Sequence, residues 1–158
     1  MVAVDVSPRA AAIARLNAVR CGVGERVTVV EGDGDWYPSA LREHDGTLAG
    51  VVSNPPYIPS ATLATLQAEV RRHEPGLALD GGDVDGMRDL TAIARGAARA
   101  LREGGLVALE TGGGEQPAKV AALLEEGGAF VDVRVVSDLA GIARHVVGVR
   151  SDAPPPKE

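Results

Sequence analysis

The 158-residue sequence is poor in cysteine, in aromatic residues and in clustered positive charge. Its single cysteine, Cys21, excludes an intramolecular disulfide, and three scattered histidines give no metal-ligand pattern, so we expect no metal site. The net charge of −6 argues against a chain whose main partner is nucleic acid, because phosphate binding needs clusters of lysine and arginine. No apolar run approaches the length of a membrane span, so no membrane partner is expected.

What the sequence does contain is an alternation of short apolar strands and helical segments. Strands are predicted at 2–5, 27–31, 48–53, 106–110, 130–136 and 143–149, and helices at 8–20, 61–72, 87–102 and 116–126. The last two strands are expected to be antiparallel across a turn at 138–141. The pattern predicts one α/β domain with an open twisted sheet over residues 1–150, and a disordered, proline-rich tail over 151–158.

The first helix has a clear start signal. Ser7 supplies a hydroxyl N-cap, and Pro8 suits the first helical position. Apolar residues recur on one face of this helix, namely Ala12, Ile13, Leu16 and Val19.

A rigid polar tetrapeptide, Asn54-Pro55-Pro56-Tyr57, follows the predicted strand 48–53. Open α/β sheets bind ligands at the carboxyl ends of their strands. The Asn54 side-chain oxygen and the Pro55 carbonyl can each accept a hydrogen bond, and the two prolines fix the direction of that carbonyl. Two acceptors on the hydrogens of an –NH2 group would direct its nitrogen at an electrophile, for which the sulfonium methyl of S-adenosylmethionine is the natural candidate. The alternative interpretation is a proline-stiffened turn.

The tetrapeptide and the residues after it resemble the HemK-type methyltransferases, which methylate the glutamine of the Gly-Gly-Gln motif in peptide-chain release factors. The resemblance runs from about Val2 to Val149, and its string is Asn54–Pro59, Glu69-Val70, His73-Glu74-Pro75, Leu77–Gly82 and Asp85-Gly86. It implies a Rossmann-like methyltransferase sheet, S-adenosylmethionine as cofactor, and a release factor as protein substrate. It also implies that Asn54, Pro55, Pro56 and Tyr57 are catalytic, and no direct sequence-specific nucleic-acid binding is expected.

Three further residues are candidates for cofactor binding beside Asn54. Asp5 ends the first strand, where a carboxylate can accept both ribose hydroxyls, although it could instead help to cap the following helix. The resemblance implies that Asp35 and Trp36 flank the adenine, with Trp36 packing on the base. Trp36 could instead cover the sheet edge, and Asp33 could align in place of Asp35.

One part of the family pattern is missing from the sequence. A first strand with a glycine-rich turn should precede Asp5, and the glycine run at 112–114 follows a later strand. We therefore expect the C-terminal part of a longer protein, with a sheet that lacks its first strand and has either a gap or two strands that slide together. Such a chain is expected to bind the cofactor weakly or not at all.

Two other functions stay open at this point. An adenine amino-methyltransferase of DNA or RNA would use the same tetrapeptide, because its substrate also presents a conjugated –NH2 group. A non-catalytic fragment is the third hypothesis, and the missing glycine-rich turn favours it. The sequence does not decide the compartment, which would be cytoplasmic in a bacterium and could be an organelle otherwise.

Overall fold

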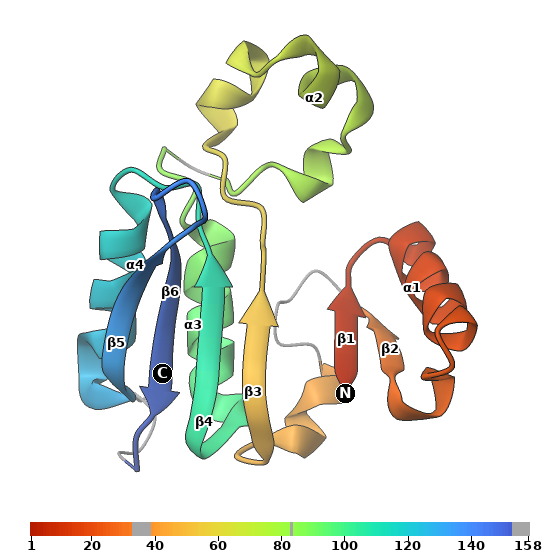
Figure 1. The fold of residues 1–158 in the computed structure, drawn as a ribbon, viewed down its shortest axis with the longest axis vertical. Helices are drawn as coiled ribbons and strands as arrows, with labels where there is room; N and C mark the ends of the chain where they lie inside the picture. Colours follow the sequence, from red (N-terminus) through yellow and green to blue (C-terminus); the bar gives the residue numbers. More distant parts are fainter. Residues whose placement is uncertain (33–38, 83, 153–158) are drawn as a thin grey trace. The chain divides into compact units, whose positions relative to one another are not determined.

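The computed structural model describes residues 1–32, 39–82 and 84–152, and the chain divides into two compact units, Met1–Glu43 and His44–Glu158. In the first unit, β1 (Val2–Asp5) pairs in parallel with β2 (Thr28–Glu31), and α1 (Pro8–Arg20) and the 3-10 turn η1 (Gly24–Arg26) connect them (Figure 1). The register places Asp5 opposite Glu31 at the carboxyl ends of both strands.

The start of α1 is as predicted, but its apolar face is not the buried one. Ser7 caps the helix through its hydroxyl, which accepts a hydrogen bond from the Ala10 amide at 3.3 Å. The buried residues are Ala11 and Ala18, whereas Leu16 is 48% exposed and Val19 is 69% exposed. Small alanine side chains therefore make the buried face of this helix, and periodicity weighted by large apolar residues points to a different face.

The second unit is built on a four-stranded sheet in the order β3-β4-β6-β5. β3 (Leu48–Ser53) is parallel to β4 (Leu101–Glu110), while β6 (Ala143–Arg150) is antiparallel to both β4 and β5 (Phe130–Ser137). The predicted antiparallel pair at the C-terminal end is thus confirmed. The 3-10 turn η2 (Ser39–His44) lies where the first unit ends and the second begins. The remaining elements of the second unit are η3 (Ser60–Thr65), α2 (Ala68–His73), η4 (Gly76–Ala78), α3 (Arg88–Ala100), α4 (Gln116–Glu125) and η5 (Glu126–Gly128).

The core of this unit lies between its sheet and two helices. α3 packs against β4, α4 packs against β5 and β6, and the two helices also contact each other (Figure 1). Leu90, Ile93 and Ala97 lie on the buried face of α3. The residues with less than 2% exposure include Leu90, Val107, Leu109, Val120, Leu124 and Val146. Arg150 is buried as well, and its guanidinium donates hydrogen bonds to three backbone carbonyls, those of Ala98, Ala129 and Ser151.

Within the described residues the strands form two sheets, one of β1 and β2 and one of β3, β4, β6 and β5. Ser151, the first residue of the predicted tail, is hydrogen-bonded to Ala129 and Gly128, and residues 153–158 lie outside the described part. Among the helices that the structure describes, none is long and apolar enough to cross a membrane.

Candidate active site

The parallel pairing of β3 and β4 brings two polar stretches to one edge of the sheet. Ser53 lies opposite Leu109 in the register, so Asn54 follows β3 at the same end of the sheet at which Glu110 ends β4. Thr111, directly after β4, is fully buried and donates from both its amide and its hydroxyl to the Arg144 carbonyl, at 2.7 and 3.0 Å. The carboxyl-end edge expected from the sequence is therefore a well-packed part of the second unit.

The tetrapeptide leaves β3 with its first residue exposed and its second residue buried. Among the described residues, neither the Asn54 side chain nor the Pro55 carbonyl takes part in a hydrogen bond. Both oxygens are thus acceptors that no donor of the described residues occupies. The catalytic role of Asn54, Pro55, Pro56 and Tyr57 stays a prediction that this geometry allows.

The chain directly after the tetrapeptide is held by a short parallel bridge between Ile58 and Asp80. The Ile58 amide donates to the Leu79 carbonyl at 3.0 Å, and the Gly81 amide donates to the Ile58 carbonyl at 2.9 Å. The two ends of the segment that contains η3, α2 and η4 are therefore hydrogen-bonded to each other. This closes a loop whose base is fixed next to Tyr57.

Two glycines allow the backbone to approach Tyr57 closely. A β-carbon added to Gly81 would lie 2.7 Å from the Tyr57 α-carbon, and one added to Gly86 would collide with the Tyr57 carbonyl oxygen. Gly86 also has a φ of +69°, a conformation that L side chains rarely adopt. Any larger residue at these positions would push the backbone of Tyr57 out of place.

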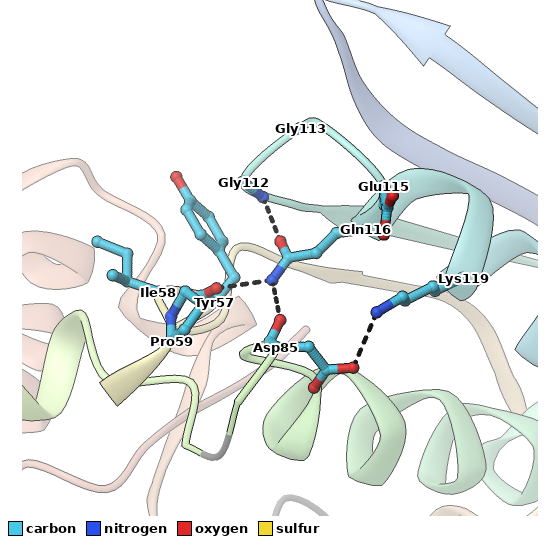
Figure 2. A pocket seen from close by; sticks show the side chains of 9 residues that line it. All are labelled: Tyr57, Ile58, Pro59, Asp85, Gly112, Gly113, Glu115, Gln116 and Lys119. Atoms are coloured by element: carbon cyan, nitrogen blue, oxygen red, sulfur yellow. Dashed lines mark hydrogen bonds and ion pairs between the residues drawn. The ribbon is translucent and has the colours of Figure 1, made fainter. Parts of the chain in front are cut away.

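The side chain of Gln116 joins three loops at this edge. Its Nε2 group donates to the Tyr57 carbonyl at 2.8 Å and to the Asp85 carbonyl at 2.7 Å, and its Oε1 accepts from the Gly112 amide at 2.8 Å. Figure 2 shows the carboxamide at the centre of these partners. Gln116 is the first residue of α4, so a rigid helix carries this connection.

A pocket of about 510 Å³ opens beside the carboxamide, within the usual size range of ligand sites. The tetrapeptide contributes Tyr57 to its wall, and the glycine turn after β4 contributes backbone (Figure 2). Its lining residues are Tyr57, Ile58, Pro59, Asp85, Gly112, Gly113, Glu115, Gln116 and Lys119.

Two carboxylates near this edge are stabilised in their charged form. A hydrogen bond from the Lys119 ammonium, at 3.1 Å, lowers the pKa of Asp85 below its ordinary value. The Ser60 hydroxyl, at 2.6 Å, and the Gly82 amide, at 2.9 Å, donate to Asp80 and lower the pKa of that carboxyl. The ionised Asp80 therefore connects residues on the two sides of the loop base, and the ionised Asp85 connects its own segment to α4.

The candidate cofactor residues are distributed over separate parts of the chain. Asp5 belongs to the first unit, where its Oδ1 accepts a hydrogen bond from the Ser7 amide at 2.8 Å. Its second carboxylate oxygen has no partner among the described residues, so it fits a hydroxyl donor such as a ribose. Asp33, Asp35 and Trp36 lie outside the described residues.

Comparison with known proteins supplies relatives that match nearly the whole chain. A protein of Gloeobacter violaceus, named release factor glutamine methyltransferase, is 44% identical over 146 residues, which are 92% of this chain and 48% of that protein. Proteins of the same name from Synechocystis and Caulobacter vibrioides are 44% and 42% identical, over 91% and 94% of this chain and 46% and 48% of their own lengths. No protein-family model matches the sequence.

The chain is a relative of the release factor glutamine methyltransferases. The family resemblance carried by the tetrapeptide and its downstream string is thereby confirmed. The chain spans about half the length of the curated relatives it matches.

Solved structures confirm the predicted fold. A predicted O-methyltransferase from Agrobacterium tumefaciens has a TM-score of 0.61 at 18% identity, covering 97% of this chain and 64% of its own. An S-adenosylmethionine-dependent O-methyltransferase from Thermotoga maritima has a TM-score of 0.62 at 14% identity, covering 99% of this chain and 51% of its own. At these identities the likeness concerns the fold alone.

Several residues that organise this edge were not predicted to do so from the sequence. The sequence predicts Gln116 only as the start of a helix. Gly81 and Gly86 enter the sequence analysis only as parts of the string that resembles the family. The available signal for Gln116 is its position, because it follows a glycine run at the carboxyl end of β4. Its partner Tyr57 lies 59 residues away, which no local pattern indicates.

Proposed function

We propose that this chain carries the methyl-transfer part of a release factor glutamine methyltransferase. The substrate is the glutamine of a Gly-Gly-Gln motif, and the methyl donor is S-adenosylmethionine. The observation that carries the proposal is the similarity to enzymes of that name over 91% to 94% of the chain. The same relatives do not favour the alternative of an adenine amino-methyltransferase. They are bacterial proteins, which supports a cytoplasmic location among the two that were left open.

The unpartnered acceptors of the tetrapeptide fit this reaction. The Asn54 side-chain oxygen and the Pro55 carbonyl would each accept one hydrogen of the substrate carboxamide. An amide nitrogen is a poor nucleophile because its lone pair is delocalised, and acceptors on both hydrogens would favour the reactive, pyramidal geometry over the flat one. Most of the acceleration would come from positioning. The nitrogen that gains the methyl carbon loses one proton to water, so no strong base is required.

The cofactor, when bound, supplies a methyl carbon attached to a positively charged sulfur. On this chain the Asp5 carboxylate would accept hydrogen bonds from its ribose hydroxyls, because one oxygen is already engaged by the Ser7 amide and the other is available. Asn54 and either Asp33 or Asp35, together with Trp36, complete the set that the resemblance implies.

The test uses two proteins, because the chain spans about half the length of its relatives. The first is the chain itself, and the second is the Gloeobacter violaceus relative with its matched 146-residue stretch replaced by the corresponding residues of this chain. Each is incubated with S-adenosylmethionine and a peptide that contains Gly-Gly-Gln, and mass spectrometry locates the added methyl group. A peptide with Gly-Gly-Asn and an adenine-containing oligonucleotide serve as controls.

We expect the chimaera to methylate the glutamine side chain and neither control substrate. Methylation of the oligonucleotide in preference to the peptide would replace this proposal by the nucleic-acid alternative. A chimaera that is folded but transfers no methyl group, beside an active Gloeobacter enzyme, would support the non-catalytic hypothesis.

A further inference from the structure

The carboxamide of Gln116 has every hydrogen-bonding group engaged. Its two N–H groups donate to the carbonyls of Tyr57 and Asp85, and its oxygen accepts from the Gly112 amide. The two accepting carbonyls lie 59 and 31 residues away in the sequence. Glutamine is the residue type that offers two donors and an acceptor on one flat group at this reach, so a residue without the donors would leave both carbonyls unsatisfied.

The backbone is anchored both before and after the tetrapeptide, whose last residue, Tyr57, accepts the hydrogen bond from Gln116. On one side, Ser53 is fixed by the β3–β4 ladder, and on the other, Ile58 is fixed by its bridge to Asp80. Between these anchors lie two prolines with fixed φ and then Tyr57. A change in the direction of the Tyr57 carbonyl would have to be absorbed by the few free dihedral angles between these anchors, next to the peptide unit that bears the Pro55 carbonyl.

We propose that Gln116 is a positioning residue for methyl transfer, which holds the Tyr57 carbonyl so that the Asn54 and Pro55 acceptors meet the substrate carboxamide. This inference rests on the proposed function. Gln116 touches the backbone of the tetrapeptide and acts on the substrate only through it. A displacement of about 1 Å in a positioning group can reduce the rate on the order of 100-fold, so a loss of this connection acts on kcat.

The glycines around the connection support this assignment. A β-carbon on Gly112 would lie 3.0 Å from the Gln116 Oε1 and 3.1 Å from the Tyr57 ring, and one on Gly86 would lie 2.9 Å from the Gln116 Nε2. The carboxamide thus fills a space that is bounded by backbone on two sides. On these two sides the carboxamide cannot move without moving a loop.

The experiment compares Gln116→Met and Gln116→Glu with Gln67→Met. Met keeps the length of the side chain without polar groups, and Glu keeps the acceptor without the two donors. Gln67 is the chain's other glutamine, exposed, and its side chain makes no capping hydrogen bond. Methyl-transfer kinetics are measured in the chimaera described above, and amide hydrogen exchange is measured in the 158-residue chain.

For both Gln116 variants we expect kcat to fall about 10- to 100-fold, with KM for S-adenosylmethionine within about twofold of the unsubstituted protein. Amide exchange is expected to accelerate at Ile58 and Gly81, and to stay unchanged at Val107 and Val147 in the β4–β6 ladder. Gln67→Met should change none of these quantities.

Unchanged kcat and unchanged exchange at Ile58 and Gly81 in both Gln116 variants would overturn the inference. So would a parallel fall in kcat, cofactor affinity and ladder protection, because that pattern describes general loss of structure. If the unsubstituted chimaera methylates no peptide, the proposed function fails, and the exchange at Ile58 and Gly81 alone decides whether Gln116 positions the tetrapeptide.

Discussion

The carbonyl oxygen of Tyr57 occupies the place where a β-carbon on Gly86 would lie, so only glycine fits there. Gly86 directly follows Asp85, whose own carbonyl accepts a hydrogen bond from Gln116. The segment Asp85-Gly86 is thus held against the tetrapeptide in two ways. The backbone of Gly86 packs closely on Tyr57, and the Gln116 side chain donates hydrogen bonds to the carbonyls of both Asp85 and Tyr57.

Replacement of Gly86 by alanine is expected to destabilise the protein and to impair methyl transfer. The new β-carbon would collide with the Tyr57 carbonyl, and the φ of +69° costs an L residue about 1–2 kcal/mol even without the collision. Gly76→Ala is the matched control, because a β-carbon there meets nothing within 4 Å. Urea unfolding of both variants checks this, and equal midpoints would show that the close approach is not maintained in solution.

Asn54→Ala in the chimaera is expected to reduce methyl transfer by about 100-fold or more and to leave cofactor binding largely intact. The substitution removes one of the two acceptors for the substrate carboxamide, whereas the other candidate cofactor residues, Asp5 among them, stay in place. Asn17→Ala, at the chain's other asparagine on the exposed side of α1, should be neutral. Transfer rates and calorimetric titration with S-adenosylmethionine provide the comparison. Unsubstituted turnover by Asn54→Ala would end the assignment of this residue.

Leu90→Ala is expected to lower the free energy of unfolding by about 2–5 kcal/mol, because it removes buried methyl groups and leaves a cavity under α3. Leu90 is 0% exposed, whereas Leu77 is 61% exposed. Leu77→Ala should therefore change stability by no more than about 0.5 kcal/mol. Denaturant titration of the two variants measures both values, and a small effect at Leu90 would mean that the core between α3 and β4 is loosely packed.

The hairpin between β5 and β6 should lose stability on acidification through Asp138. Backbone hydrogen bonds from Ile142 and Ala140, together with the nearby Arg144, lower the pKa of the Asp138 carboxyl. Because the folded pKa is lower than the unfolded one, the contribution is complete above the ordinary carboxyl pKa and is lost as the pH falls through the folded pKa.

The predicted loss of stability at low pH can be measured by comparing the natural protein with Asp138→Asn. The two are expected to differ in unfolding free energy at neutral pH and to converge in acid, where the aspartate is protonated and resembles asparagine. An NMR titration of the Asp138 carboxyl gives the folded pKa directly. A difference that grows towards low pH would contradict the assignment.

Much of the second unit is readable from local pattern. The strand before Asn54, the existence of α3 and the closing antiparallel pair follow from periodicity and turn residues. The sequence predicts a strand at 106–110, but β4 already begins at Leu101, because Leu101 is buried and pairs with Leu48. A glycine pair at 104–105 reads locally as a helix stop, and it does not reveal that the chain has already become extended.

Only part of the candidate site can be predicted from the local sequence pattern. Asn54 to Tyr57 stand out because rigid acceptors follow a strand end. The connection from Gln116 to Tyr57 depends on the three-dimensional meeting of an α4 side chain with a distant backbone carbonyl. The buried face of α1 also differs from the predicted one, because close packing through Ala11 and Ala18 leaves no signal in an apolar pattern.

Gly81 and Gly86 contact Tyr57 through backbone atoms on both sides. This restricts which substitutions the two glycine positions can accept. A clash between side chains can be relieved by a new rotamer or a smaller neighbour, but backbone atoms offer neither route. Substitution at either glycine can be tolerated only together with a change in loop length or path. These two positions should therefore be nearly invariant in any library of functional variants, even where the surrounding loop accepts many residues.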